Sequence, residues 1–219
     1  MRPLTHHMVT TKTYMKKDFQ KHLVDGETTG QYLADVLHKT RTNFRPLPGI
    51  TDHDNYHTSY RIQANIDCDE VYPNIYIGDA PTAKNKKYLK ILDITHVLNT
   101  AEGKRFGFVD TDANYYKDTN IKYMGLPLAD LASTCINEYF HTAATFIEEA
   151  VSTGGKAFVH CMMGISRSAT CVVAYLMIKK QMLASEAIRT VRKNRDIHPN
   201  NGFLHQLAEL DNQLRRQRL

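Results

Sequence analysis

Residues 159–170, Val-His-Cys-Met-Met-Gly-Ile-Ser-Arg-Ser-Ala-Thr, carry the strongest structural signal in this chain of 219 residues. Apolar residues lead up to Cys161 and continue beyond Arg167, so the segment predicts a buried strand, a tight loop and a helix. Gly164 lets the backbone of such a loop turn where a side chain would crowd it. The stretch therefore indicates an α/β domain, with a central mixed sheet flanked by helices and this Cys-x5-Arg loop between a strand and a helix.

The backbone of this loop is suited to binding an anion. The N–H groups of residues 162–167 can converge on one point, and the positive end of the following helix adds to their attraction for an anion. A phosphate can be held in this way without a metal, and we expect neither a metal nor a cofactor. The residues expected to surround the phosphate are Met162, Met163, Gly164, Ile165, Ser166 and Arg167.

Several side chains of this segment have chemistry suited to phosphoryl transfer. The field of the loop should lower the pKa of Cys161, which makes its thiolate a candidate nucleophile. Arg167 presents a planar fork that can bind two equatorial phosphate oxygens. Ser168 is placed to donate a hydrogen bond to the sulfur, and His160 is expected to orient the loop rather than act on substrate. A purely structural role for Cys161, as a small buried apolar residue, would leave Arg167 and Gly164 unexplained.

Around these residues the sequence resembles the dual-specificity protein phosphatases, in particular the small atypical, VHR-type members of the cysteine-dependent tyrosine phosphatase superfamily. The similarity covers most of residues 67–214 and includes segments 70–78, 95–99, 194–195 and 199–203. It implies a shallow pocket that accepts phosphotyrosine as well as phosphoserine and phosphothreonine. It also implies hydrolysis through a phosphocysteine intermediate.

The resemblance assigns the general acid to Asp130, at the end of the segment Gly-Leu-Pro-Leu-Ala-Asp. Its proposed work is to protonate the departing oxygen and then to take a proton from the attacking water. Spacing alone leaves Asp110, Asp112 and Asp118 open as alternatives, because they also lie in or beside expected loops.

Three further residues are assigned by the same resemblance. Arg195 matches a basic position that could contact a second phosphate, and a surface charge at a helix end is an equal alternative. Asn99 and Asn200 are expected to brace the loop by hydrogen bonds rather than touch substrate.

The substrate class is less sharply defined than the chemistry. Met162 and Met163 stand where other members carry charged residues, which leaves the substrate preference open. A lipid or RNA phosphatase with the same cysteine chemistry is an alternative. Such enzymes often line the pocket with basic residues, so the uncharged loop favours phosphorylated proteins, with MAP kinases as a family-level candidate. A non-catalytic phosphoprotein-binding scaffold is a third hypothesis. It is disfavoured because Cys161, Arg167 and Asp130 are all present.

Composition limits the remaining classes of partner. The net charge is only +5, from 28 Lys and Arg against 23 Asp and Glu, and nucleic acid is not expected as a partner. Four cysteines without metal or disulfide spacing fit a reducing compartment, so we expect a cytoplasmic protein, with the nucleus as a second location. The chain start lacks the apolar stretch of a signal peptide, and the longest apolar run, residues 169–178, is too short to insert into a membrane. A homodimer is a candidate assembly.

The sequence divides into three parts. Residues 1–65 form a polar, partly flexible extension with turn signals at 46–49 and 51–55, residues 66–215 form the catalytic domain, and residues 216–219 form a basic tail. Within the extension, residues 30–40 have apolar spacing typical of a helix, packed on the core or, alternatively, open to a partner or substrate. In the domain we expect strands at 71–72, 74–77, 95–98, 121–126 and 156–160, the last three of them buried. Helices are expected at 83–92, 136–151, 166–180, 184–194 and 202–215.

Overall fold

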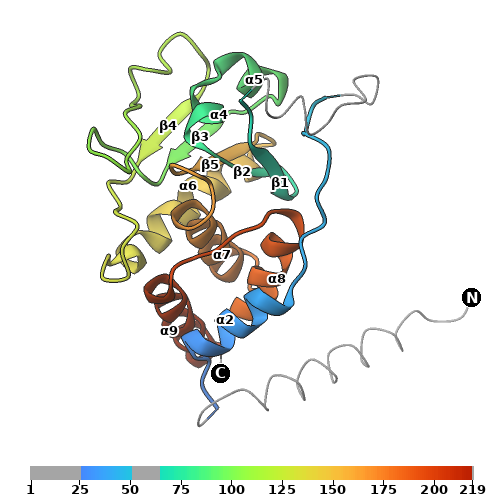
Figure 1. Ribbon diagram of the computed structural model, residues 1–219, viewed down its shortest axis with the longest axis vertical. Helices are drawn as coiled ribbons and strands as arrows, with labels where there is room; N and C mark the ends of the chain where they lie inside the picture. The colour runs from blue at the N-terminus through green and yellow to red at the C-terminus, as the bar shows by residue number, and fades with distance from the viewer. Residues whose placement is uncertain (1–25, 51–64, 219) are drawn as a thin grey trace, which may run out of the picture.

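The computed structural model describes residues 26–50 and 65–218 (Figure 1). The turn signals at 51–55 and most of the polar extension lie outside these residues. Five short strands form one sheet in the order β1-β2-β5-β3-β4. β1 and β2 pair antiparallel and the other neighbours pair parallel, so the predicted mixed sheet is confirmed. The strands are β1 (Cys68–Tyr72), β2 (Ile75–Gly78), β3 (His96–Asn99), β4 (Lys122–Gly125) and β5 (Ala157–His160).

Helices cover both faces of this sheet, as the alternation of strands and helices predicts (Figure 1). Ile75 and Ile77 of β2 join the large core on one face, whereas Tyr76 between them joins the smaller core on the other. Val159 and Phe158 of β5 divide in the same way, because successive side chains of a strand point to opposite faces. Sheets covered on both faces have strands that are apolar throughout, which explains the continuous apolar run before Cys161.

The helices that make up the two layers follow one another along the chain in the expected order. The face of the sheet that carries the smaller core is covered by α4 and α5. The face that carries the large core is covered by the remaining helices. Their bounds are α2 (Gly30–Lys39), α4 (Ala80–Lys84), α5 (Lys86–Ile91), the 3-10 turn η1 (Ile136–Tyr139), α6 (Phe140–Ser152), α7 (Arg167–Lys179), α8 (Ala184–Asn194) and α9 (Asn201–Gln217).

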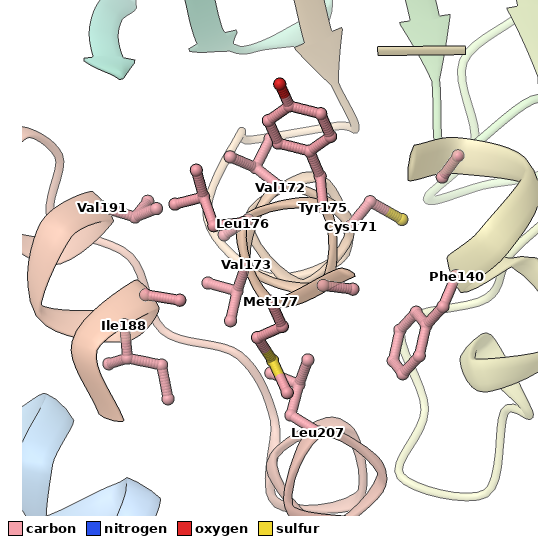
Figure 2. Packing of buried hydrophobic residues seen from close by; sticks show 14 of the residues in the cluster. Phe140, Cys171, Val172, Val173, Tyr175, Leu176, Met177, Ile188, Val191 and Leu207 are labelled. Atoms are coloured by element: carbon pink, nitrogen blue, oxygen red, sulfur yellow. The ribbon is translucent and has the colours of Figure 1, made fainter. Parts of the chain in front are cut away.

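The helix α7 lies at the centre of the large core. Figure 2 looks along this helix and shows Val173 and Leu176 directed toward α8, and Met177 beside Leu207 of α9. On the other side Phe140 of α6 faces the same helix. Residues 167–177 of α7 are all buried, which fixes the position of its N-terminal end and of the loop that precedes it.

The helix expected at residues 30–40 is present as α2 and packs on the core. Thr29 caps its first turn, and its face of Tyr32, Leu33, Val36 and Leu37 is buried against α8 and α9 (Figure 1). That face is therefore not available to a partner. The division of the chain at residue 65 stays a prediction.

Two expected elements differ from the structure. The helix expected at 83–92 is divided into α4 and α5, because Asn85 ends the first and its side chain accepts a hydrogen bond from Tyr88 N–H at the start of the second. The strand expected to be buried at 121–126 is β4, which lies at the edge of the sheet and is partly exposed. Within the described residues, no helix is long and apolar enough to cross a membrane.

Candidate active site

The loop from Cys161 to Arg167 joins the end of the central strand β5 to the start of α7. The parallel strands β2 and β3 lie on either side of β5, so the loop lies at the edge where their carboxyl ends meet. Gly164 has a φ of +67°, in the left-handed region that favours glycine. A side chain at this position would also collide with the carbonyl oxygen of Gly78.

Cys161 lies at the base of the loop, 1% exposed, with donors directed at its sulfur. The N–H of Gly164 lies 3.2 Å from Sγ, and the hydroxyl of Ser168 lies 3.4 Å from it. Burial by itself raises the pKa of a thiol. Here the hydrogen bonds from Ser168, together with the charge of Arg167 and the backbone of Ile165, outweigh burial and lower the pKa of Cys161. The arrangement favours the nucleophilic thiolate.

Arg167 begins α7 and is buried beside the loop. Its Nη1 donates to the carbonyl oxygens of Gly107, at 2.9 Å, and Leu128, at 3.0 Å. Among the described residues, its buried Nε has no hydrogen-bond partner. The guanidinium is thus anchored through one nitrogen while its Nε–H remains available to an oxyanion.

Asp130 is the acidic residue that the fold brings to this loop. Its Oδ1 accepts hydrogen bonds from the hydroxyl of Ser166, at 2.8 Å, and from the side-chain amide of Asn200, at 2.9 Å. Its Oδ2 lies 3.6 Å from Nε of Arg167. The side chain is 36% exposed, so it can reach both solvent and a bound ligand.

The other three candidate aspartates are used elsewhere or lie exposed. Asp112 accepts a hydrogen bond from the N–H of Tyr115, and Asp118 pairs with Lys86. Asp110 is exposed in the segment after Val109. Geometry therefore favours Asp130 among the four.

The side chains of the remaining loop residues differ in their exposure to solvent. Met162 packs against the small cluster that contains Cys161, whereas the side chain of Met163 is 61% exposed. Ile165 is half-buried, and Ser166 supports Asp130 through its hydroxyl. An exposed methionine at the loop leaves its rim uncharged at that position.

His160 is fully buried at the end of β5, stacked on Phe158. Its Nδ1 lies 3.1 Å from the carbonyl oxygen of Cys161, which requires the proton on Nδ1. Burial lowers the pKa of His160 to about 4, so the ring is neutral at physiological pH. It contacts the backbone of the loop and does not contact the sulfur, as its position in the strand predicts.

The two asparagines support different loops. Asn200 caps α9 through the N–H of Phe203 and holds Asp130, so it contributes to the site. Asn99 was expected to brace the Cys161 loop, but it bonds instead to Val109, Thr111 and Tyr123 in the neighbouring segment. The reason is its place at the end of β3, where its amide meets the segment that returns toward β4.

The structure corrects both interpretations of Arg195. The residue is 4% exposed, so it is not a surface charge. Its five N–H groups are all engaged: they donate to Asp67, Asp69 and the carbonyl oxygens of Met163 and Gly164. Burial opposes the charge, but the two carboxylates raise the pKa of Arg195 above its usual value. No donor of the guanidinium is free for a second phosphate.

Some supporting groups were not predicted from the sequence. Thr100 donates both its hydroxyl and its N–H to the carbonyl oxygen of His160, which ties the end of β3 to the end of β5. The carbonyls of Gly107 and Leu128 anchor Arg167, and a backbone carbonyl has no residue-specific signal in a sequence. In residues 26–50 and 65–218, no group of three or more His, Cys, Asp or Glu side chains is arranged to hold a metal.

The family model described as the catalytic domain of dual specificity phosphatases matches residues 75–213. This span includes Cys161, Arg167, Asp130 and Ser168 and covers more than half of the chain. The chain therefore belongs to the dual specificity phosphatase family, whose catalytic domain hydrolyses phosphate esters.

Solved structures with this fold support the same assignment. The human tyrosine phosphatase-like serine/threonine/tyrosine-interacting protein is 32% identical, with a TM-score of 0.58 over 65% of this chain and 93% of that one. DUSP15 is 29% identical, with a TM-score of 0.57 over 69% and 93% of the two chains. A mouse putative dual specificity phosphatase, solved with zinc tungstate, is 26% identical, with a TM-score of 0.61 over 69% and 90%.

Proposed function

We propose that this protein is a phosphatase of phosphorylated proteins, which hydrolyses phosphotyrosine and phosphoserine or phosphothreonine through a phosphocysteine intermediate. The observation that carries the proposal is the environment of Cys161. Its sulfur accepts hydrogen bonds from Gly164 and Ser168, and Oδ2 of Asp130 lies 3.6 Å from Nε of Arg167 at the end of the same loop. This arrangement supports Cys161 as the nucleophile, Arg167 as the oxyanion clamp and Asp130 as the acid.

The first step transfers the phosphoryl group to sulfur. The thiolate of Cys161 attacks phosphorus, the S–P bond forms, and the bond to the leaving oxygen breaks. Asp130 donates a proton to that oxygen, so the product leaves as a neutral hydroxyl group. Arg167 and the N–H groups of the loop hold the equatorial oxygens throughout.

The second step releases phosphate. Asp130, now a carboxylate, takes a proton from a water molecule as the water oxygen attacks phosphorus. The S–P bond breaks, and inorganic phosphate leaves. Ser168 donates a hydrogen bond to the departing thiolate, which stabilises the negative charge on sulfur.

The proposed partners are phosphorylated proteins, with MAP kinases as candidate substrates, in the cytoplasm and also in the nucleus. The uncharged and exposed Met163 supports protein rather than phosphoinositide or RNA substrates, since polyanionic ligands are met by basic residues. A non-catalytic scaffold is the second candidate function. It is favoured by the likeness to a protein whose name describes it as phosphatase-like and interacting.

Phosphate release from matched peptides tests the proposal. Peptides with one phosphotyrosine, one phosphothreonine or both would be compared with a phosphoinositide, using the full chain and the variant Cys161→Ser. We expect release from the peptides to exceed release from the lipid. Cys161→Ser should abolish turnover and retain peptide binding, because the loop does not ionise a serine hydroxyl.

Three results would count against the proposal. Binding without turnover by the unaltered protein would indicate the scaffold. Faster release from the phosphoinositide would indicate a lipid phosphatase. Substantial turnover by Cys161→Ser would remove the covalent mechanism itself.

A further inference from the structure

The carbonyl groups of the Cys161 loop all have partners in the surrounding protein. Five consecutive carbonyl oxygens, from residue 161 to residue 165, each accept a hydrogen bond. Two of these five bonds come from one side chain, Arg195. The donors are, in order, His160 Nδ1 at 3.1 Å, Ala80 N at 3.1 Å, Arg195 Nη2 at 3.1 Å, Arg195 Nε at 2.7 Å and His198 N at 2.9 Å.

The two carbonyls bound by Arg195 belong to the peptide units that face the sulfur. In a planar trans peptide unit, the carbonyl of one residue and the N–H of the next point in opposite directions. The carbonyl of Met163 therefore opposes the N–H of Gly164, which donates to Sγ at 3.2 Å. In the same way the carbonyl of Gly164 opposes the N–H of Ile165, a second backbone group that favours the thiolate. Arg195 binds the outer side of both units.

Arg195 is itself held in one orientation. Both oxygens of Asp67 accept from it, at 2.9 and 2.6 Å, and Asp69 of β1 accepts at 2.7 Å. The guanidinium lies so close to Gly164 that a side chain on that glycine would collide with Nη2. Hydrogen bonds from all five N–H groups, two of them to one carboxylate, restrict the guanidinium to this orientation.

We propose that Arg195, held by Asp67 and Asp69, is a positioning residue that directs the N–H groups of Gly164 and Ile165 toward the sulfur of Cys161 and toward the phosphate. The proposal rests on the thiolate chemistry proposed above. Arg195 does not contact substrate, so it has no part in recognising a second phosphate. Its removal should therefore change the reactivity of a sulfur that its side chain does not touch.

Other titratable or charged groups lie near Cys161 and Arg195, and their titration must be distinguished from that of the Cys161 thiol. Arg167 lies on α7, Asp130 on the segment before η1, and His160 on β5. His160 has a pKa of about 4 and is neutral at higher pH. Asp79, at the start of α4, has a pKa raised by burial. None of these groups is a thiol, so the pH dependence of alkylation reports on sulfur directly.

The test measures the alkylation rate of Cys161 by iodoacetamide over a pH series. It uses the full chain with Cys135→Ser, because Cys135 is an exposed thiol outside the site. The modified peptide is identified by mass, because Cys68 and Cys171 are buried as Cys161 is. Burial raises the pKa of Cys171 to about 12, so this residue stays a thiol over the pH series. In this background, Arg195→Met should raise the pKa of the Cys161 thiol by about one unit. At a pH below this pKa, the fraction of Cys161 present as thiolate, and with it the alkylation rate, then falls about tenfold. It should also lower kcat/KM on a phosphopeptide by about tenfold. Lysine has only three donors for the same acceptors. We therefore expect Arg195→Lys to have a thiol pKa and a kcat/KM between those of the unaltered protein and of Arg195→Met.

Ile188→Ala is the matched control, because Ile188 is a buried residue of α8, the helix that Arg195 caps at its C-terminal end, and is packed in the apolar core. It should lower the thermal midpoint without changing the thiol pKa. If Arg195→Met lowers the midpoint but leaves the thiol pKa unchanged, Arg195 is merely structural and the proposal is wrong. If Arg195→Met does not fold, Arg195→Lys is measured instead, and an unchanged thiol pKa in that variant also shows that the proposal is wrong.

Failure of the proposed function gives a different result. An unaltered protein with a low thiol pKa that never releases phosphate from peptides would contradict the proposed function and leave the positioning role intact. A selective loss of affinity for the doubly phosphorylated peptide in Arg195→Met, without a change in thiol pKa, would make Arg195 a substrate contact and overturn the inference.

Discussion

The two halves of the candidate active site are held in place by different means. The loop from Cys161 to Arg167 lies between a central strand and a buried helix, and its carbonyls are fixed by backbone N–H groups and by the buried side chains of His160 and Arg195. The segment with Asp130 is anchored by buried leucines at 126 and 128 but is largely exposed beyond them. There, Asp130 is held by side chains. Changes in the nucleophile loop should therefore affect stability as well as rate, whereas changes around the acid should affect mainly rate.

The largest effect that separates the two halves is expected for Asp130→Asn. An amide cannot donate the proton that the leaving oxygen needs, so kcat on phosphopeptides should fall by roughly 10²–10⁴-fold. The thermal midpoint should change little, because the side chain is partly exposed. With an aryl phosphate whose leaving group is very acidic, the loss should shrink.

Asp112→Asn is the control for this change, since Asp112 is exposed and accepts a backbone hydrogen bond away from the loop. It should leave kcat unaltered. A normal rate for Asp130→Asn on poor leaving groups, with the defect found in Asp112→Asn or another of the candidate aspartates, would reassign the acid.

On the nucleophile side, the buried His160 should make stability depend on pH. Its pKa is about 4 in the folded protein against 6.5 for an unperturbed histidine, because burial disfavours the charged ring. The unfolded chain therefore binds this proton first as pH falls. The contribution to stability is complete above pH 6.5 and decreases between pH 6.5 and 4, by about 3 kcal/mol in total.

Urea unfolding at a series of pH values, compared between the unaltered protein and His160→Asn, measures this contribution. The variant should be less sensitive to acid over the same interval, because asparagine does not titrate. Equal slopes for the two proteins would show that His160 is not the group responsible.

The smallest effect is expected at Asn200, whose side chain caps α9 and also donates a hydrogen bond to Asp130. Asn200→Ala removes the cap of α9, at a cost of about 1 kcal/mol in the free energy of unfolding, and also a hydrogen bond to Asp130. Asn200→Asp keeps a capping oxygen but places a second carboxylate beside Asp130. We expect Asn200→Asp to retain stability and lose several-fold in kcat.

This pair of variants separates capping from positioning of the acid. Circular dichroism melts give the stability, and phosphopeptide turnover gives the rate. A normal rate for Asn200→Asp would mean that the contact with Asp130 does not matter for catalysis.

Local sequence was sufficient for the nucleophile loop and for most of the secondary structure. A continuous apolar run predicted β5, and apolar residues at helical spacing predicted α7, α8 and α9 closely, because the extended strand and the turn of a helix are short-range properties. The division of α4 from α5 was missed, although the capping asparagine is visible in the sequence. The edge position of β4 was missed because the order of strands is not a local property.

The environments of the polar residues were decided by tertiary structure. The sequence alone determined that Cys161, Gly164 and Arg167 share one tight loop, since six residues between a strand and a helix leave the chain few conformations. It did not determine that Arg195 would be buried against Asp67 and Asp69, more than 120 residues earlier in the chain. An arginine at the end of a helix has the same local signal whether it faces solvent or carboxylates, and only the packing of α8 against β1 decides between them.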